Sequence, residues 1–498
     1  MSDDRVSFRR LGRDTVIYGI GMMLSRAVSF FMLPVYTRYL TTADYGIVNL
    51  LDMTIDISYI LFTAGMSAGM SLFYFEARSD QERADVVITS YALEMGLTLL
   101  GTVALLLASP WVWQYGLKGA GTVLFVRITA VNFALQMLTA VPLVLLQIRQ
   151  RPHAVITINL IRLVIQLSLN ILFVVVLRMG VKGILITGLI VNSLQGFVMM
   201  AWLLREVRGR VRMEIVRQLR RFGLPFQISR AGSFVLAFGD RFFLQASRGA
   251  SAVGIYGLAY QFGFLLNQLS TEQILKAWNP QRLQMLNDPR EQRDAHFDRG
   301  FHYFNLVLFT VATGIGIFIK PVIAVMTTAP FHPAAALVPI ILAAYVVQGW
   351  DKVLQFGIGV SRKTKYIGYS TWAGLAVVLV LYATLIPRWG GLGAAVATLV
   401  AFIVRAGVGY YWSHRLWPIS YSWAPNLRLA GYSASLVLAA FLIPARGVPA
   451  QLALGFGLLA IYAVLTWFTF LQADDRRLVA SIARSPARAG SLIRGLAG

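Results

Sequence analysis

Apolar runs of roughly 20 residues or more recur along the whole 498-residue chain, and they constrain its fold more than any other feature. A run of that length, coiled as an α-helix, crosses a hydrocarbon core of about 30 Å. Charged residues make up only 13% of the chain, whereas soluble globular proteins carry about 25%. The alternating pattern typical of transmembrane β-strands is not visible. The sequence therefore predicts an all-α polytopic membrane protein.

We expect about fourteen transmembrane helices, joined mostly by short connections. The predicted spans are 14–39, 44–75, 85–109, 120–147, 154–177, 183–204, 222–247, 252–280, 300–325, 335–358, 366–386, 391–412, 428–444 and 450–471. The longer connections are a basic segment near the middle of the chain, the 281–299 loop and the C-terminal tail.

Lys and Arg are unevenly distributed among the segments that join these spans. If the N-terminus is inside, 29 of them fall in inner segments and 7 in outer loops. Cytoplasmic loops carry the excess of Lys and Arg. The count predicts that both termini lie in the cytoplasm. The net charge of +23 then indicates contact with anionic membrane lipid, and no nucleic-acid motif accompanies it.

Short turn sequences recur at an offset of about 209 residues. Residues 45–47 read Tyr-Gly-Ile, and residues 253–255 read Val-Gly-Ile at an offset of 208. Residues 178–183 and 388–393 form a second glycine-containing pair at an offset of 210. Each repeat holds six spans, so both enter the membrane in the same direction. This pattern predicts two parallel six-helix repeats, with a site between them.

The repeats give a domain plan with two additional C-terminal helices. Its parts are an N-terminal six-helix lobe (1–204), a basic cytoplasmic hinge (205–221), a C-terminal six-helix lobe (222–415), helices 13 and 14 (416–471) and a basic cytoplasmic tail (472–498). The hinge holds seven arginines in seventeen residues. It has the character of an interfacial amphipathic helix that lies on anionic headgroups. A second interpretation is that it attracts an anionic substrate.

Ionisable side chains occur within several spans, where they are costly and usually functional. Asn49, Asp52, Asp56 and Tyr59 share one helical face, because their spacings are 3, 4 and 3. Such polar stripes line a water-filled cavity or face one another. Salt bridges within the protein, such as Glu272 with Lys276, are the alternative explanation.

The charged spans of the two repeats supply the candidate site residues. The substrate-binding candidates are Arg26, Arg230, Arg241, Lys276, Gln227 and Gln268. The acidic candidates on these spans are Asp52, Asp56 and Glu272. Arginine suits pyrophosphate and carboxylate, because its planar fork binds oxyanions through two hydrogen bonds. The basic candidates Arg26, Arg230, Arg241 and Lys276 lie on spans that also carry four acidic residues, Asp52, Asp56, Asp240 and Glu272. The charges on these spans therefore balance, and a strongly cationic cavity is an inference from the chain as a whole.

The sequence shows no motif that would indicate an enzyme. There is no Walker sequence for ATP hydrolysis, no cysteine, and no Ser–His–Asp or metal-ligand spacing. We therefore expect no catalytic residues, no metal site and no cofactor. Coupling to H⁺ or Na⁺ would supply the driving force.

The opening of the chain resembles the Wzx-type polysaccharide transporters. These are oligosaccharide-lipid flippases of the multidrug/oligosaccharidyl-lipid/polysaccharide (MOP) superfamily. The resemblance rests on residues 13–51, with the Leu33-Pro34 step and the sequence from Tyr39 to Gly46, and on the second-half echo at 251–256. It implies an undecaprenyl-pyrophosphate-linked oligosaccharide as substrate, moved by alternating access to the periplasmic leaflet. It also implies that Arg26 and Arg230 hold the pyrophosphate and that Asp52, Asp56 and Glu272 are the ion-coupling residues. The protein would then lie in the bacterial inner membrane, with a polymerase or glycosyltransferases as partners.

Two rival functions remain open at this point. The first is a cation-coupled multidrug exporter of the same superfamily, which the acidic residues of the second span favour. Such exporters typically have twelve spans, however. A non-transporting membrane scaffold of a polysaccharide assembly complex is the other. A scaffold has no need of paired charged stripes at membrane depth, which argues against it.

Overall fold

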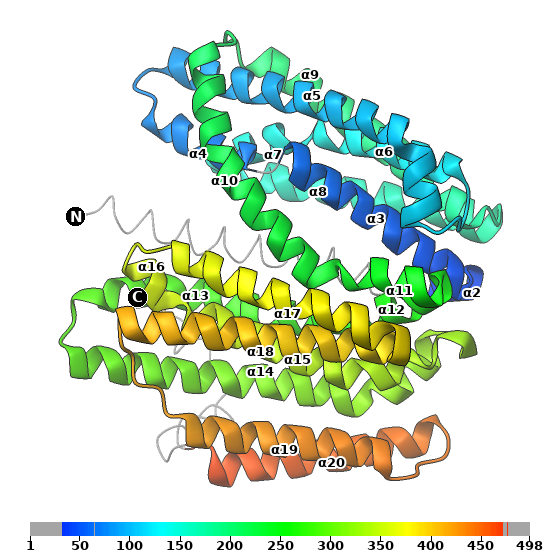
Figure 1. Cartoon of the computed structure of the whole chain (residues 1–498), viewed down its shortest axis with the longest axis vertical. Coiled ribbons are helices and arrows are strands. Elements are labelled where there is room, and N and C mark those ends of the chain that lie inside the picture. Colours follow the sequence, from blue (N-terminus) through cyan, green and yellow to red (C-terminus); the bar gives the residue numbers. More distant parts are fainter. Residues whose placement is uncertain (1–31, 64, 472–475, 477–498) are drawn as a thin grey trace. The chain divides into compact units, whose positions relative to one another are not determined.

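The computed structural model describes residues 32–63, 65–471 and 476 (Figure 1). Helices account for most of these residues, and no strand occurs among them. The predicted fold class, an all-α polytopic membrane protein, is confirmed. The helices divide into two compact units, one made mainly of residues 13–257 with 371–401 and the other of 258–370 with 402–498. We call them the N-terminal unit and the C-terminal unit.

The N-terminal unit contains the helices of the first half of the chain. These are α2 (Leu33–Tyr39), α3 (Thr42–Phe62), α4 (Met66–Glu76), α5 (Asp80–Trp111), α6 (Val123–Met137), α7 (Ala140–Ile148), α8 (Pro152–Asn170), α9 (Gly180–Glu206), α10 (Met213–Phe238) and α11 (Asp240–Arg248). Helix α6 packs against α3, α5 and α9, and α8 packs against α9. Helix α6 is therefore at the centre of this bundle.

The C-terminal unit is organised around one long helix. It contains α13 (Glu272–Gln284), α14 (Arg290–Met326), α15 (Ala334–Leu354), α16 (Phe356–Val360), α19 (Trp423–Leu442) and α20 (Val448–Thr469). Helices α12 (Ala250–Leu266), α17 (Lys365–Trp389) and α18 (Gly391–Leu416) have residues in both units. Helix α14 packs against α15, α19 and α20, and α19 packs against α20. The last two helices thus form a hairpin on α14.

Ten helical stretches among the described residues are long and apolar enough to cross a membrane. They are Thr42–Phe62, Asp80–Gly116, Val123–Ile148, Pro152–Val176, Gly180–Glu206, Arg290–Met326, Ala329–Val360, Lys365–Trp389, Gly391–Leu416 and Val448–Thr469. Three further predicted spans coincide with α10, with α12 to α13 and with α19. The first predicted span lies mostly outside the described residues. The count of fourteen stays a prediction.

Helix α3 begins where the sequence supplies a capping box. The Thr41 hydroxyl accepts a hydrogen bond from the Asp44 backbone N–H at 3.1 Å, and the Asp44 carboxylate accepts one from the Thr41 N–H at 3.1 Å. Two of the unpaired donors at the helix start are thereby satisfied. The helix ends at Phe62, and Gly65, with a φ of 90°, precedes α4. The predicted span 44–75 is thus two helices.

The basic segment differs in part from the predicted interfacial helix. Residues 207–212 are extended, and α10 begins at Met213, inside the segment. The buried Asp85 carboxylate accepts a hydrogen bond from the Arg210 backbone N–H at 2.7 Å and pairs with the Arg212 guanidinium at 2.5 Å. A Cβ atom on Gly209 would lie 2.2 Å from the Ala84 carbonyl oxygen. Residues 207–212 are therefore a connector fixed against the start of α5, and the helical part of the segment, residues 213–221, is continuous with α10. Its position at the membrane interface stays a prediction.

Arg282 joins the ends of two helices in the C-terminal unit. Its side chain is buried among the rings of Trp278, Phe297 and Phe356, with its guanidinium carbon 3.7 Å from the centroid of the Phe356 ring. It donates a hydrogen bond to the Val353 carbonyl oxygen at 2.9 Å. A cation suits this place, because the C-terminus of a helix carries partial negative charge. The contact fixes the end of α13 next to the end of α15.

Candidate functional site

The first turns of α3 and α12 are in direct backbone contact within the N-terminal unit. A Cβ atom on Gly46 would lie 1.9 Å from the Ala250 carbonyl oxygen, and one on Gly254 would lie 1.9 Å from the Thr42 carbonyl oxygen. The hydroxyls of Thr42 and Ser251 are 2.6 Å apart. Only glycine allows two helices to approach so closely.

The residues that meet in this contact are separated by nearly the same number of positions as the two sequence repeats. Thr42 meets Ser251 at an offset of 209, while Gly46 meets Gly254 and Asn49 meets Gly257, each at an offset of 208. Each residue thus lies against its own counterpart, as in an interface with two-fold symmetry. The first pair of glycine turns that indicated a repeat in the sequence, around Gly46 and Gly254, therefore forms a close contact between two helices of this unit.

Below this contact, one face of α3 carries charge and another face packs against α10. Asp52 and Asp56 are exposed, although the helix around them is apolar. Met53 and Ile60 pack with Phe234 of α10 in an apolar cluster. Gln227, also on α10, donates a hydrogen bond to the Phe62 carbonyl oxygen at 3.3 Å. The pairing of α3 with α10 leaves both carboxylates accessible.

Arg230 and Glu94 extend this charged region to α10 and α5. The Arg230 side chain is exposed, and it lies close enough to Tyr59 to interact with it electrostatically. Glu94 of α5 is also near Tyr59, but it is fully buried, and neither of its carboxylate oxygens has a hydrogen-bond partner in the described part of the chain. Burying a carboxyl group without a hydrogen-bond partner is costly. We call Asp52, Asp56, Glu94 and Arg230 the α3 cluster.

Arg241 lies in a closed network and not on an accessible face. Its guanidinium contacts the Asp240 carboxylate at 3.0 Å and lies over the rings of Phe238 and Tyr256, and it is only 1% exposed. The Tyr256 hydroxyl donates to Asp240 at 2.5 Å. Arg241 therefore neutralises a buried carboxylate between α10 and α12. The sequence predicted it as a substrate ligand, a role that this burial does not favour.

A second charged group occurs in the C-terminal unit, where α12 passes into α13. Residues Asn267–Thr271 form one turn of π-helix, a feature frequent at functional sites. The ammonium of Lys352, on α15, lies 2.5 Å from the Glu272 carboxylate and 3.2 Å from the Asn267 side-chain oxygen. Both charged side chains are 35% exposed. We call Asn267, Glu272 and Lys352 the α13 cluster.

The remaining predicted site residues have different surroundings. Lys276 is exposed and Gln268 is half-buried. The close ion pair of Glu272 is with Lys352, whereas Lys276, the partner considered from the sequence, acts on it only electrostatically. Arg26 lies outside the described residues.

Three members of these clusters, Glu94, Asn267 and Lys352, were not among the predicted site residues. Glu94 lies in an apolar span, and the polar residues at helical spacing from it, Ser90, Tyr91 and Thr98, carry no charge. Lys352 lies near the end of its predicted span, where long side chains commonly reach the interface. Its partner lies 80 residues away in the sequence. Neither contact leaves a periodic signal.

The effects on transport of substituting Glu272 and Lys352 should depend on one another. We expect Lys352→Met and Glu272→Gln each to lower transport severalfold, and the double variant to lose little more than either single one. Residues in one ion pair show non-additive effects. Transport and membrane abundance of the four forms would be measured, with Lys363→Met, which removes an exposed lysine outside both clusters, as the matched control. If the loss of transport in the double variant equalled the product of the two single losses, the two residues would not act as a functional pair.

A family model described as polysaccharide biosynthesis protein matches residues 11–280, which is more than half of the chain. Among solved structures, the fold is similar to that of the lipid II flippase MurJ in an inward closed conformation, with a TM-score of 0.74 at 12% identity over 91% of this chain and 99% of that one.

The fold is also similar to that of multidrug resistance MATE family transporters of the MOP superfamily. An inward-facing form gives a TM-score of 0.64 at 15% identity over 81% of this chain and 97% of the other. An outward-facing form gives 0.53 at 16% identity over 81% and 94%. At these identities the likeness concerns the fold. None of the curated proteins compared with the chain matches its sequence.

Proposed function

This chain belongs to the polysaccharide biosynthesis protein family, and from that premise we propose that it is a flippase for an undecaprenyl-pyrophosphate-linked oligosaccharide. It would move this substrate from the cytoplasmic to the periplasmic leaflet by alternating access. The product would enter the synthesis of O-antigen, capsule or exopolysaccharide. Its place would be the bacterial inner membrane, with both termini in the cytoplasm.

The observation that carries this proposal is the α3 cluster. Arg230 presents a guanidinium on an accessible face of α10, near a helix with two exposed carboxylates. Such groups are costly in a membrane unless they serve a polar substrate or ion. A guanidinium binds the oxygens of a pyrophosphate through two hydrogen bonds. We assign Arg230 to the anionic group of the substrate, together with Arg26.

The carboxylates would couple transport to an ion. Asp52 and Asp56 are accessible, whereas Glu94 is enclosed without a partner, so the group offers both exposed and buried sites for a proton. The α13 cluster adds a carboxylate, Glu272, that is held by Lys352. An anionic substrate that attracted Lys352 would release Glu272 to bind H⁺ or Na⁺. In this scheme Gln227 and Gln268 provide neutral polar contacts.

The domain plan follows the same scheme. Two six-helix lobes, 1–204 and 222–415, would alternate their access around the substrate, joined by the basic segment 205–221. Helices 13 and 14, within 416–471, would add a surface that twelve-helix exporters lack. A polymerase or glycosyltransferases would act with the protein on the same polysaccharide.

Deletion of the gene tests the function directly. We expect surface polysaccharide to be lost and a lipid-linked oligosaccharide to accumulate in the cytoplasmic leaflet, because synthesis continues while translocation stops. Mass spectrometry of extracted lipid, with an impermeant probe for leaflet, would measure both, and a plasmid copy is the control. Normal surface polysaccharide in the deletion strain would refute the proposal.

A cation-coupled multidrug exporter is the second candidate. It is favoured by the composition of the α3 cluster, in which three acidic residues accompany one arginine. Acidic groups suit cationic drugs. Resistance to cationic dyes on overexpression, combined with unchanged polysaccharide in the deletion strain, would favour this function over the flippase.

A further inference from the structure

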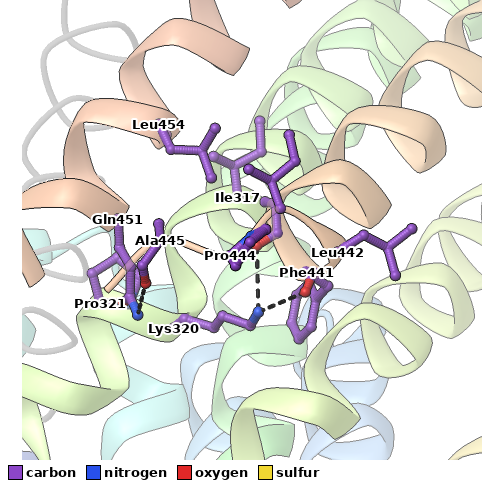
Figure 2. A pocket seen from close by; sticks show the side chains of 12 residues that line it. Ile317, Lys320, Pro321, Phe441, Leu442, Pro444, Ala445, Gln451 and Leu454 are labelled. Carbon is purple, nitrogen blue, oxygen red and sulfur yellow. Dashed lines mark hydrogen bonds between the residues drawn. The ribbon is translucent and has the colours of Figure 1, made fainter. Parts of the chain in front are cut away.

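A small cavity lies where the last two helices meet the end of α14, inside the C-terminal unit (Figure 2). Its volume is about 230 Å³. It is formed by the last turns of α14, the end of α19, the connection to α20 and the first turns of α20. The residues of the charged clusters do not contribute to it.

Lys320 supplies the cavity with a positive charge. Its ammonium donates to the carbonyl oxygens of Phe441 at 3.0 Å and Ala440 at 3.4 Å, and it lies 4.4 Å from the centroid of the Phe441 ring (Figure 2). These carbonyls end α19, where the helix dipole is negative. An ammonium has three donors, so two are used and a third can reach a ligand in the cavity.

Gln451 supplies an acceptor on the opposite side. Its amide nitrogen donates to the Ala445 carbonyl oxygen at 3.4 Å (Figure 2). Its amide oxygen is buried and has no hydrogen-bond partner among the described residues. A buried acceptor without a partner is costly, and a ligand hydroxyl would satisfy it. The cavity therefore offers one donor with a positive charge and one acceptor.

The size and position of the cavity select the kind of ligand. Sites for whole small molecules usually have about 300 Å³ or more, so this one accommodates a headgroup and not an entire lipid. Lys320 lies six residues before the end of α14, close to where a spanning helix leaves the hydrocarbon core. Leu442 and Ile443 line the cavity and are 70% and 44% exposed, which gives an apolar path outwards for acyl chains.

We propose that this cavity binds the headgroup of an anionic phospholipid with a phosphoglycerol group. The phosphate would accept the third hydrogen bond of Lys320, and a glycerol hydroxyl would donate to Gln451. Bound there, the lipid would tie α19 and α20 to α14. This site is independent of the transported substrate, so its failure would not affect the proposed function.

Lipid binding by the full-length protein tests the site. Native mass spectrometry would count phosphatidylglycerol, phosphatidylethanolamine and free glycerol phosphate bound to the wild type and to Lys320→Met. We expect the wild type to bind phosphatidylglycerol in preference to phosphatidylethanolamine. The variant should bind phosphatidylglycerol at least about tenfold more weakly than the wild type, because a charge-assisted hydrogen bond is lost. Lys182→Met removes an exposed lysine near the start of α9 and should bind as the wild type does.

A second variant separates the lost charge from a damaged fold. Leu454→Trp fills the cavity and keeps Lys320, and it should also lose phosphatidylglycerol while eluting as a monodisperse protein. Equal binding of phosphatidylglycerol by the wild type and both variants would overturn the proposal. So would equal binding of phosphatidylethanolamine. Binding of free glycerol phosphate as tightly as the lipid would show a soluble-anion site instead.

Discussion

Gly254→Ala is expected to abolish transport and to lower the thermal stability of the protein sharply, although it adds a single methyl group. That carbon would lie 1.9 Å from the Thr42 carbonyl oxygen, a backbone atom that cannot rotate away. Helices α3 and α12 would have to separate, and the hydroxyl contact between Thr42 and Ser251 would be lost with them. Overpacking of this kind costs about 1–3 kcal/mol and occasionally more, and a backbone clash belongs at the upper end.

Gly96→Ala is the matched control for this prediction. Gly96 is an exposed glycine within α5, and a Cβ atom there would meet nothing within 4 Å. Alanine is favoured over glycine in a helix by about 1 kcal/mol, so the control should be neutral or slightly stabilising. Melting temperature in detergent and surface polysaccharide would be measured for both variants. A Gly254→Ala protein as stable and active as the control would show that the two helices do not need this contact.

Arg230→Ala is expected to abolish polysaccharide export and to leave the protein in the membrane at its normal level. The side chain is exposed on α10, so its removal leaves no cavity in the core. Its loss takes away a guanidinium that we assign to the anionic group of the substrate, and transport should fall by at least about tenfold. Arg230→Lys keeps the charge without the planar fork and should be intermediate.

Arg217→Ala provides the control for charge alone. Arg217 is on the same helix, exposed, and within its first turns. Export measured against membrane abundance should remain near the wild-type level in this variant. The same assay applies to Arg26→Ala, for which we expect loss of export as well. Wild-type export by Arg230→Ala at normal abundance would refute the site assignment.

The course of the helices was largely predictable from hydropathy, since length and apolar composition are local properties. The breaks within them were not. Gly65 separates α3 from α4 through a backbone conformation, and the π-helical turn from Asn267 to Thr271 changes the helix without changing its composition. The extended form of residues 207–212 depends on Asp85, a residue more than 100 positions earlier in the sequence.

The polar face of α3 was predictable, because Asp52 and Asp56 lie at helical spacing and both proved exposed. The partners of the charged residues were not predictable. Arg241 was expected in a cavity but is held by its neighbour Asp240. Glu272 was expected to face water or Lys276, yet Lys352 of another helix pairs with it. Periodicity shows which side of a helix is polar, while the partner across the bundle depends on the packing.

The reciprocal contact between α3 and α12 has the form of an interface between two copies of one protein. Two identical chains joined at such an axis must carry the same residue at both positions of every pair. A single chain with duplicated halves is free of that requirement, and here Thr42 faces Ser251 while Asn49 faces Gly257. Each half of a single chain can therefore acquire its own charged residues without a matching change in the other.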